Sequence, residues 1–184
     1  MARKPADVRM MNKAVHYLGR YSSSRHKLAQ VLQRFADRKL ADYDPQDIRA
    51  ALEQTLNQCA KLGYIDDWQF AVTTARSQRR LGRSQAVIRQ RLRQHALDDD
   101  TIMQALAQAD EDSIDADLQA AIKFAQRRRL GPFANRTSAL HLRHDPQQWR
   151  QRDLGAMARA GFSFATARKI IEHDDPDTID ELLD

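Results

Sequence analysis

The chain has 184 residues, of which 42% are hydrophobic and 30% charged; this composition suits a globular protein and contains no apolar run long enough for a membrane span. The one cysteine, Cys59, excludes an internal disulfide and cysteine-rich zinc frameworks, and it is expected to be a small apolar side chain in a helix core. The formal net charge of +5 favours polyanionic partners without specifying one. Since no apolar stretch follows the basic N-terminus, we expect no secretory signal peptide and a cytoplasmic protein.

The first part of the chain predicts three helices. Glycine and proline are scarce and the two-residue alternation of strands is absent, so the expected fold class is all-α. A first helix is predicted over residues 8–20, a second follows a cap at Ser22 or Ser24, and a third runs from Pro45 to Gly63. Their apolar stripes, at helical spacing, are Val8, Met11, Val15 and Leu18 in the first, Leu28, Val31, Leu32 and Phe35 in the second, and Ile48, Leu52, Leu56, Cys59 and Leu62 in the third.

Six further helices are predicted in the rest of the chain. The fourth opens at Asp66, which stands at capping-box spacing from Gln69, and the fifth follows Ser84. Asp98 or Asp99 caps the sixth, the seventh ends near residues 130–132, the eighth spans about 147–160, and Ser163 caps the ninth. A last acidic turn starts at Pro176. The predicted core positions are Ile88, Leu92, Ile102, Leu106, Ala109, Ile114, Leu118, Ile122, Ala125, Trp149, Met157, Phe164, Ala167 and Ile171.

The sequence repeats itself. Residues 20–24 align with residues 80–84 at an offset of 60, and the tetrapeptide Arg-Arg-Leu-Gly occurs at 79–82 and again at 128–131. We interpret these matches as three tandem three-helix modules over residues 8–65, 66–112 and 113–175, flanked by tails of residues 1–7 and 176–184. Because a three-helix unit buries little surface alone, the predicted form is an elongated array with its repeated arginines along one side.

Charge is distributed in blocks. Residues 76–95 hold seven arginines and no acid, residues 98–117 hold eight acids and no Lys or Arg, and residues 172–184 hold seven acids. Helical phase predicts an outer face shared by Arg79, Arg89 and Arg93. The basic blocks can meet phosphates or an acidic protein surface, or they can be solvated or paired with the acidic block. The acidic tail can also fold back on the basic face and weaken binding.

One segment resembles a known family. Residues 63–71, Gly-Tyr-Ile-Asp-Asp-Trp-Gln-Phe-Ala, followed by Arg76 and by residues 82–84 and 88–92, resemble the central signature of the RecX regulatory proteins. Residues 18–28 resemble that family's first-module pattern, and the resemblance covers most of residues 8–175. The chain departs from the family at His95-Ala96, where a Lys-Gly pair usually closes the fifth helix, and in longer segments at 36–45 and 132–146.

The resemblance implies a modulator of the RecA recombinase. Such proteins are helical arrays that bind the RecA–DNA filament, typically in its groove, and inhibit ATP hydrolysis and strand exchange. The partner is then the RecA filament, with DNA contacted weakly or indirectly and no membrane, and we expect a monomer. The alternative is a helical module that binds DNA without RecA. The candidate partner-binding residues are Arg20, Arg25, Arg76, Arg79, Arg80, Arg83, Arg89, Arg93, Arg127, Arg128 and Arg129.

No enzyme motif is present in the sequence. The phosphate-binding Gly-x-x-x-x-Gly-Lys loop and the Gly-x-Ser-x-Gly elbow are both absent, so we expect no catalytic residue, no metal and no cofactor. Tyr64, Trp68 and Phe70 are interpreted as core residues instead of platforms for nucleobases. His141 and His144 are interpreted as loop residues instead of metal ligands.

Overall fold

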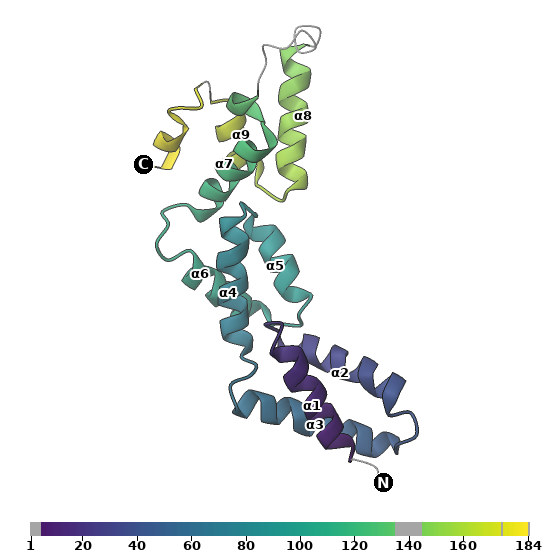
Figure 1. The fold of residues 1–184 in the computed structure, drawn as a ribbon. Coiled ribbons are helices and arrows are strands. Elements are labelled where there is room, and N and C mark those ends of the chain that lie inside the picture. Colours follow the sequence, from purple (N-terminus) through teal and green to yellow (C-terminus); the bar gives the residue numbers. More distant parts are fainter. Residues whose placement is uncertain (1–4, 135–144, 174, 184) are drawn as a thin grey trace.

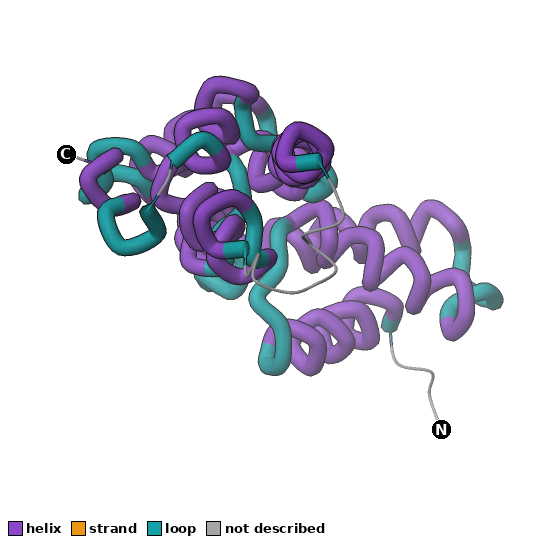
Figure 2. Tube along the Cα trace, turned by 90° about the horizontal axis from the view of Figure 1, so that it is seen from above, coloured by secondary structure: helices purple, strands orange, loops and turns teal. Residues whose placement is uncertain are grey.

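A computed structural model describes residues 5–134, 145–173 and 175–183, and every regular element in these ranges is helical. The α-helices are α1 Ala6–Leu18, α2 Arg25–Lys39, α3 Pro45–Lys61, α4 Asp67–Arg80, α5 Gln85–Arg93, α6 Asp99–Ala109, α7 Ala116–Arg128, α8 Pro146–Arg159 and α9 Phe164–Ile171. Two short 3₁₀ helices are η1 Gly131–Phe133 and η3 Ile179–Leu183. Three helical triplets follow one another in a line, α1–α3, α4–α6 and α7–α9 (Figure 1), which confirms the predicted elongated all-α array. The view from above again shows only helices and connecting loops among the described residues (Figure 2).

Side-chain caps define most helix starts. Ser24 accepts a hydrogen bond from the Lys27 backbone N–H at the start of α2, and Ser84 accepts one from Val87 at the start of α5. Asp66, Asp98 and Ser163 cap α4, α6 and α9 in the same way, each bonding the backbone N–H three residues later. Such a cap satisfies one of the free N–H groups of the first helical turn. The predicted caps at these positions are therefore confirmed.

Each triplet has its own apolar core. In the first, Leu28, Leu32, Leu56 and Cys59 are buried, and burial raises the pKa of the Cys59 thiol. The second core contains Ile88, Leu92, Ile102 and Leu106, and the third contains Leu118, Ile122, Met157 and Ile171. The third core extends into the acidic tail, because Ile179 is buried in it and Leu182 and Leu183 pack against it. This tail is thus anchored on its own module by its apolar side chains.

Several predicted core positions are wrong. In α1 the buried residues are Ala6, Met10 and Ala14, whereas Val8 and Val15 are more than 40% exposed. The buried stripe is rotated because α1 lies against both α2 and α3, and its alanines allow a close approach.

Three further apolar residues predicted as core lie on the surface. Ile114 is 88% exposed, because it precedes the Asp115 cap and is outside α7. Leu62 and Phe164 are also exposed, at the C-cap of α3 and the first residue of α9. Apolar periodicity does not distinguish such helix-end positions from interior ones.

The two junctions between triplets share one hydrogen-bond pattern. The Asp67 carboxylate in α4 accepts a bond from the Arg25 backbone N–H at 2.7 Å, and Asp117 in α7 accepts one from the Gln85 N–H at 2.7 Å. An acid near the start of one triplet thereby caps the second helix of the triplet before it. The offset-60 repeat therefore corresponds to a repeated packing geometry.

The capping serines also reach across the junctions. Ser24 Oγ lies 3.0 Å from His95 Nδ1, at the end of α5, and Ser84 Oγ donates to the Ala160 carbonyl, at the end of α8, at 2.7 Å. At the second junction Gly161 (φ +82°) approaches so closely that an added Cβ would lie 2.6 Å from Ser84 Oγ. Each junction therefore depends on residues that sequence spacing alone identifies only as caps.

Candidate partner-binding surface

The arginine that begins the first Arg-Arg-Leu-Gly copy is an internal clamp. Arg79 Nε and Nη2 donate to the two oxygens of Asp110 at 2.9 and 2.8 Å, and Nη1 donates to Asp117 at 2.7 Å. The Arg79 side chain is 10% exposed. Burial alone lowers the pKa of the guanidinium, but the hydrogen bonds and charges of Asp110 and Asp117 outweigh it and hold the pKa above its usual value. Arg79 thus joins α4, the end of α6 and α7.

The expected outer face of Arg79, Arg89 and Arg93 is therefore wrong, because the Arg79 side chain points into the junction. The alternative, pairing with the acidic block at residues 98–117, is the arrangement found for this residue. Arg93 also pairs with that block, at 2.8 Å from Asp99, but on the exposed surface. The hydrogen bond raises the pKa of Arg93 and lowers that of Asp99. Helical phase alone could not identify these partners, which lie on other helices or loops.

Four cations near the second junction form what we name the junction basic patch: Arg76 and Arg80 on α4, and Lys123 and Arg127 on α7. Each pair is spaced four residues apart and so lies on one helix face. Arg76, Arg80 and Lys123 line one recess of about 270 Å³ between the two helices. Arg127 is not part of this lining, and its Nη1 donates to the Leu81 carbonyl, at the C-cap of α4, at 2.7 Å. All four are exposed. Lys123 was not among the predicted residues, although its spacing from Arg127 marks it.

The recess also has polar and acidic members. Asp112, Gln119 and Ser113 line it, and the Ser113 hydroxyl is buried without a hydrogen-bond partner. Asp110 faces the same recess, where Arg79 neutralises it. The three exposed cations, Arg76, Arg80 and Lys123, can bind a carboxylate or a phosphate through charge-assisted hydrogen bonds.

The remaining predicted arginines are dispersed over the array. The Arg25 side chain bonds Glu53 and Asn57 on α3 at 3.1 and 2.9 Å, so it supports the first triplet. Arg20, Arg83, Arg128 and Arg129 are exposed. Arg89 is half-buried on α5.

The two Arg-Arg-Leu-Gly copies have different backbones. Gly82 has φ +66° in the first copy, whereas in the second both Arg129 and Gly131 have positive φ, of +55° and +56°. The arginines of the two copies are therefore not at equivalent positions.

The aromatic and histidine residues considered in the sequence analysis have the following positions in the structure. Trp68 and Phe70 pack against the second core as predicted, but Tyr64 is 51% exposed, so its assignment to the core is wrong. Trp149 is half-buried, with the Arg152 guanidinium 5.0 Å from its ring centroid. The predictions for His141 and His144 fall outside the described residues. Within the described ranges no three His, Cys, Asp or Glu side chains are grouped to hold a metal ion, and no helix is long and apolar enough to cross a membrane.

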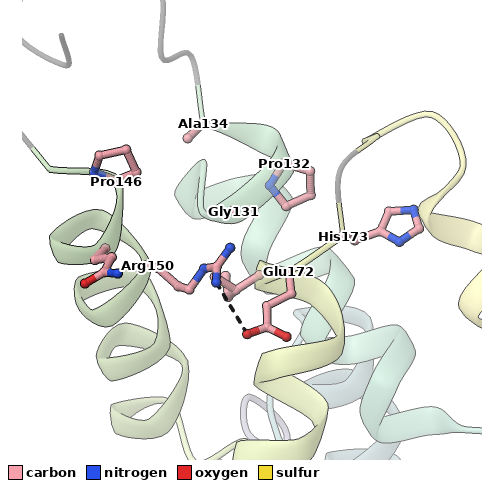
Figure 3. A pocket seen from close by; sticks show the side chains of 9 residues that line it. Gly131, Pro132, Ala134, Pro146, Arg150, Glu172 and His173 are labelled. Atoms are coloured by element: carbon pink, nitrogen blue, oxygen red, sulfur yellow. Dashed lines mark ion pairs between the residues drawn. The ribbon is translucent and has the colours of Figure 1, made fainter.

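A pocket of about 280 Å³ lies between η1, α8 and the end of α9 (Figure 3). Arg150 and Glu172 face each other in it as an ion pair of 3.7 Å, and Glu172 also accepts from Arg168 at 2.8 Å. His173 reaches the hydroxyl of Thr178 at 3.0 Å. Arg150 and Glu172 thus link α8 to the end of α9, and His173 contacts the tail at Thr178.

Comparison with known proteins points to one family. Residues 66–106 match the second three-helix domain of RecX. The chain is 33% identical to the regulatory protein RecX of Myxococcus xanthus (strain DK1622), over 92% of this chain and 88% of that protein. It is 28% identical to regulatory protein RecX of Agrobacterium fabrum (strain C58), over 87% and 80%. The crystal structure of RecX from Lactobacillus salivarius superimposes with a TM-score of 0.64 at 15% identity, over 92% of this chain and 96% of that one, and so shares the fold.

Proposed function

The chain belongs to the RecX family of regulatory proteins, and on this basis we propose that it binds the RecA–DNA filament and inhibits RecA's recombinase and ATPase activities. The family resemblance and the absence of an enzyme motif support a binding role. We place this activity in the cytoplasm, in homologous recombination and DNA repair. The protein acts as a monomer that lies in the filament groove and limits filament growth or promotes disassembly.

The junction basic patch is the observation that best supports a surface for contact with the filament. Arg76, Arg80 and Lys123 are exposed and line one recess between the second and third triplets, whose helices α4 and α7 follow one another along the array in Figure 1. Exposed cations keep part of their hydration and are free to meet a new anionic partner, whereas Arg79 is already bound by two carboxylates. Arginine can grip a carboxylate or a phosphate through two parallel hydrogen bonds. The patch therefore fits acidic side chains or phosphates presented along a filament.

The test is RecA-mediated strand exchange and RecA ATP hydrolysis, measured with and without this protein. We expect wild-type protein to slow both reactions. The triple variant Arg76→Gln/Arg80→Gln/Lys123→Gln should need about tenfold more protein for the same inhibition, the loss expected for truncated charge contacts at an interface. The matched control is Arg49→Gln/Lys61→Gln/Arg159→Gln, which removes three exposed cations outside the patch. If exchange, ATPase rate and filament length are all unaffected by the wild-type protein, the proposal is rejected.

The second candidate function is DNA binding without RecA. The exposed cations of the junction basic patch favour it, because phosphate contacts dominate nonspecific DNA affinity. It predicts tight binding of free DNA, with an affinity that falls steeply as salt rises. Weak DNA binding by a protein that inhibits RecA would reject this alternative and leave the first proposal standing.

A further inference from the structure

A second basic surface lies at the other end of the array, between α1 and α2. A groove of about 680 Å³ is lined by Lys13 and Tyr17 of α1 and by five residues of α2, namely Val31, Arg34, Phe35, Arg38 and Lys39. Its volume is within the range of about 300–1,000 Å³ that is typical of binding pockets. Figure 1 places α1 and α2 in the N-terminal triplet, well away from α7 and the junction basic patch.

The groove combines an apolar floor with a cationic rim. Tyr17, Val31 and Phe35 form the floor, are half-buried, and make the lining predominantly apolar. Lys13, Arg34, Arg38 and Lys39 supply four positive charges, and no acidic side chain belongs to the lining. None of the ion pairs found among the described residues involves these four cations. The rim charge is therefore uncompensated within the described chain.

We propose that this groove docks an acidic segment of a partner protein that carries leucine or phenylalanine anchors. The anchors bury apolar surface on Tyr17, Val31 and Phe35, which is the main favourable term in such recognition. The carboxylates flanking the anchors meet the rim cations and set the orientation of the segment. This inference goes beyond the proposed function, because it uses a different module and requires neither RecA nor DNA.

The groove suits a peptide better than a nucleic-acid strand. Its floor rings already have neighbours: the Arg9 guanidinium lies 5.9 Å from the Phe35 ring centroid, and the Tyr21 ring lies 5.2 Å from that of Tyr17. These neighbours compete with stacked bases, which need an open ring face. The aliphatic Val31, which lines the same groove, matches an apolar side chain. A peptide can direct apolar groups to the floor and charges only to the rim, whereas a nucleic acid carries a charge at every nucleotide.

A second copy of this chain is a poor occupant. The chain has two acidic blocks. The block at 98–117 already has Asp99, Asp110 and Asp117 in ion pairs within the chain, and the tail is held by Ile179, which is buried in the third core at 1% exposure. Docking the tail on another copy would remove Ile179 from this core. The excess positive charge of the chain also opposes self-association through a basic groove.

The proposal is tested by fluorescence anisotropy with the full-length protein and a labelled synthetic peptide of Asp and Glu interspersed with Leu and Phe. A second peptide has Ser in place of every Leu and Phe, and an oligothymidylate of equal charge represents nucleic acid. The rim variant is Lys13→Gln/Arg34→Gln/Arg38→Gln and the floor variant is Val31→Ser. The control is again Arg49→Gln/Lys61→Gln/Arg159→Gln, and circular dichroism verifies that each variant is folded.

We expect the acidic apolar peptide to bind, with about tenfold weaker affinity for the rim variant and for the floor variant. The control variant should bind it as the wild type does, and the Ser peptide should bind wild-type protein at least about tenfold more weakly. No binding of the acidic apolar peptide overturns the proposal. Equal binding of the Ser peptide also overturns it, because the floor would then be unused. Tighter binding of the oligothymidylate, lost in the rim variant, would assign the groove to nucleic acid instead.

Discussion

Arg79 and Arg80 are neighbours in α4 with opposite roles, and replacing each by Met separates these roles. Met keeps a long side chain with good helix propensity and removes only the charge and its donors. We expect Arg79→Met to destabilise the fold, because its two hydrogen bonds to Asp110 within the second triplet and its bond to Asp117 across the second junction are lost. We expect Arg80→Met to leave the fold intact and to weaken filament binding, because Arg80 is exposed in the junction basic patch.

The size of the Arg79 effect follows from burial. Removing one partner of a buried ion pair costs about 3–5 kcal/mol, since the remaining charge stays desolvated. Here Asp110 and Asp117 keep 22% and 26% of their side-chain surface exposed, and Asp117 keeps its bond from the Gln85 N–H. Partial hydration therefore reduces the expected loss of unfolding free energy to about 2–3 kcal/mol. An exposed substitution such as Arg80→Met should change it by no more than about 0.5 kcal/mol.

Urea unfolding followed by circular dichroism measures both values. A triple variant, Arg79→Met with Asp110→Asn and Asp117→Asn, should recover part of the lost stability, because it also removes the uncompensated carboxylates. The same proteins are then assayed for inhibition of RecA. Equal stability of Arg79→Met and Arg80→Met would refute the clamp, and full inhibition by Arg80→Met would remove Arg80 from the contact surface.

Three further changes address the junctions. Ala96 has φ +56°, a backbone conformation that is strained for a residue with a Cβ. Ala96→Gly should therefore raise the free energy of unfolding, measured by urea titration, by about 0.5–1 kcal/mol. No gain in this free energy would contradict the strain at Ala96. Burial, followed by the charges of Arg91, Lys27 and His26, lowers the pKa of His95. His95 therefore binds a proton more readily in the unfolded chain than in the folded one. The free energy of unfolding should fall as the pH drops below about 6.5. His95→Gln should flatten this dependence, and an unchanged slope would exclude His95 as its source. Gly161→Ala should lower the thermal unfolding midpoint, because the new Cβ would lie 2.6 Å from Ser84 Oγ. The expected loss of unfolding free energy is about 1–3 kcal/mol. An unchanged midpoint would show that the junction can relax.

Much of the fold could be predicted because its signals are local. A cap such as Ser24 or Asp98 accepts a hydrogen bond from the backbone N–H three residues later. A glycine at the end of a helix indicates a left-handed backbone conformation at that same residue. Ala96 has the same left-handed backbone two residues after the C-cap of α5, although it is not a glycine. The order of helices and the repeat of triplets follow from such short-range information.

The surface could not be predicted in the same way, because exposure depends on distant partners. Arg79 and Arg80 have the same local sequence context, yet Arg79 finds Asp110 and Asp117 on later elements and Arg80 stays exposed. The groove of the first triplet combines Lys13 from α1 with Arg34 and Arg38 from α2. A charge block in sequence therefore marks a basic region but does not distinguish a clamp from a contact residue.

The two junctions differ in how firmly they hold the array. Both have the acid that caps the preceding triplet, Asp67 in the first and Asp117 in the second. At the second, α4 also packs directly on α7 and Arg79 bridges Asp110 and Asp117. At the first, the hydrogen bonds of Asp67 and Ser24 join the two triplets. Bending should therefore concentrate at the first junction, where no helix packing like that of α4 on α7 is found among the stronger helix contacts of the described residues. A stiff second junction keeps the cations of α4 and α7 in fixed register, while a more flexible first junction lets the N-terminal groove reach its ligand independently.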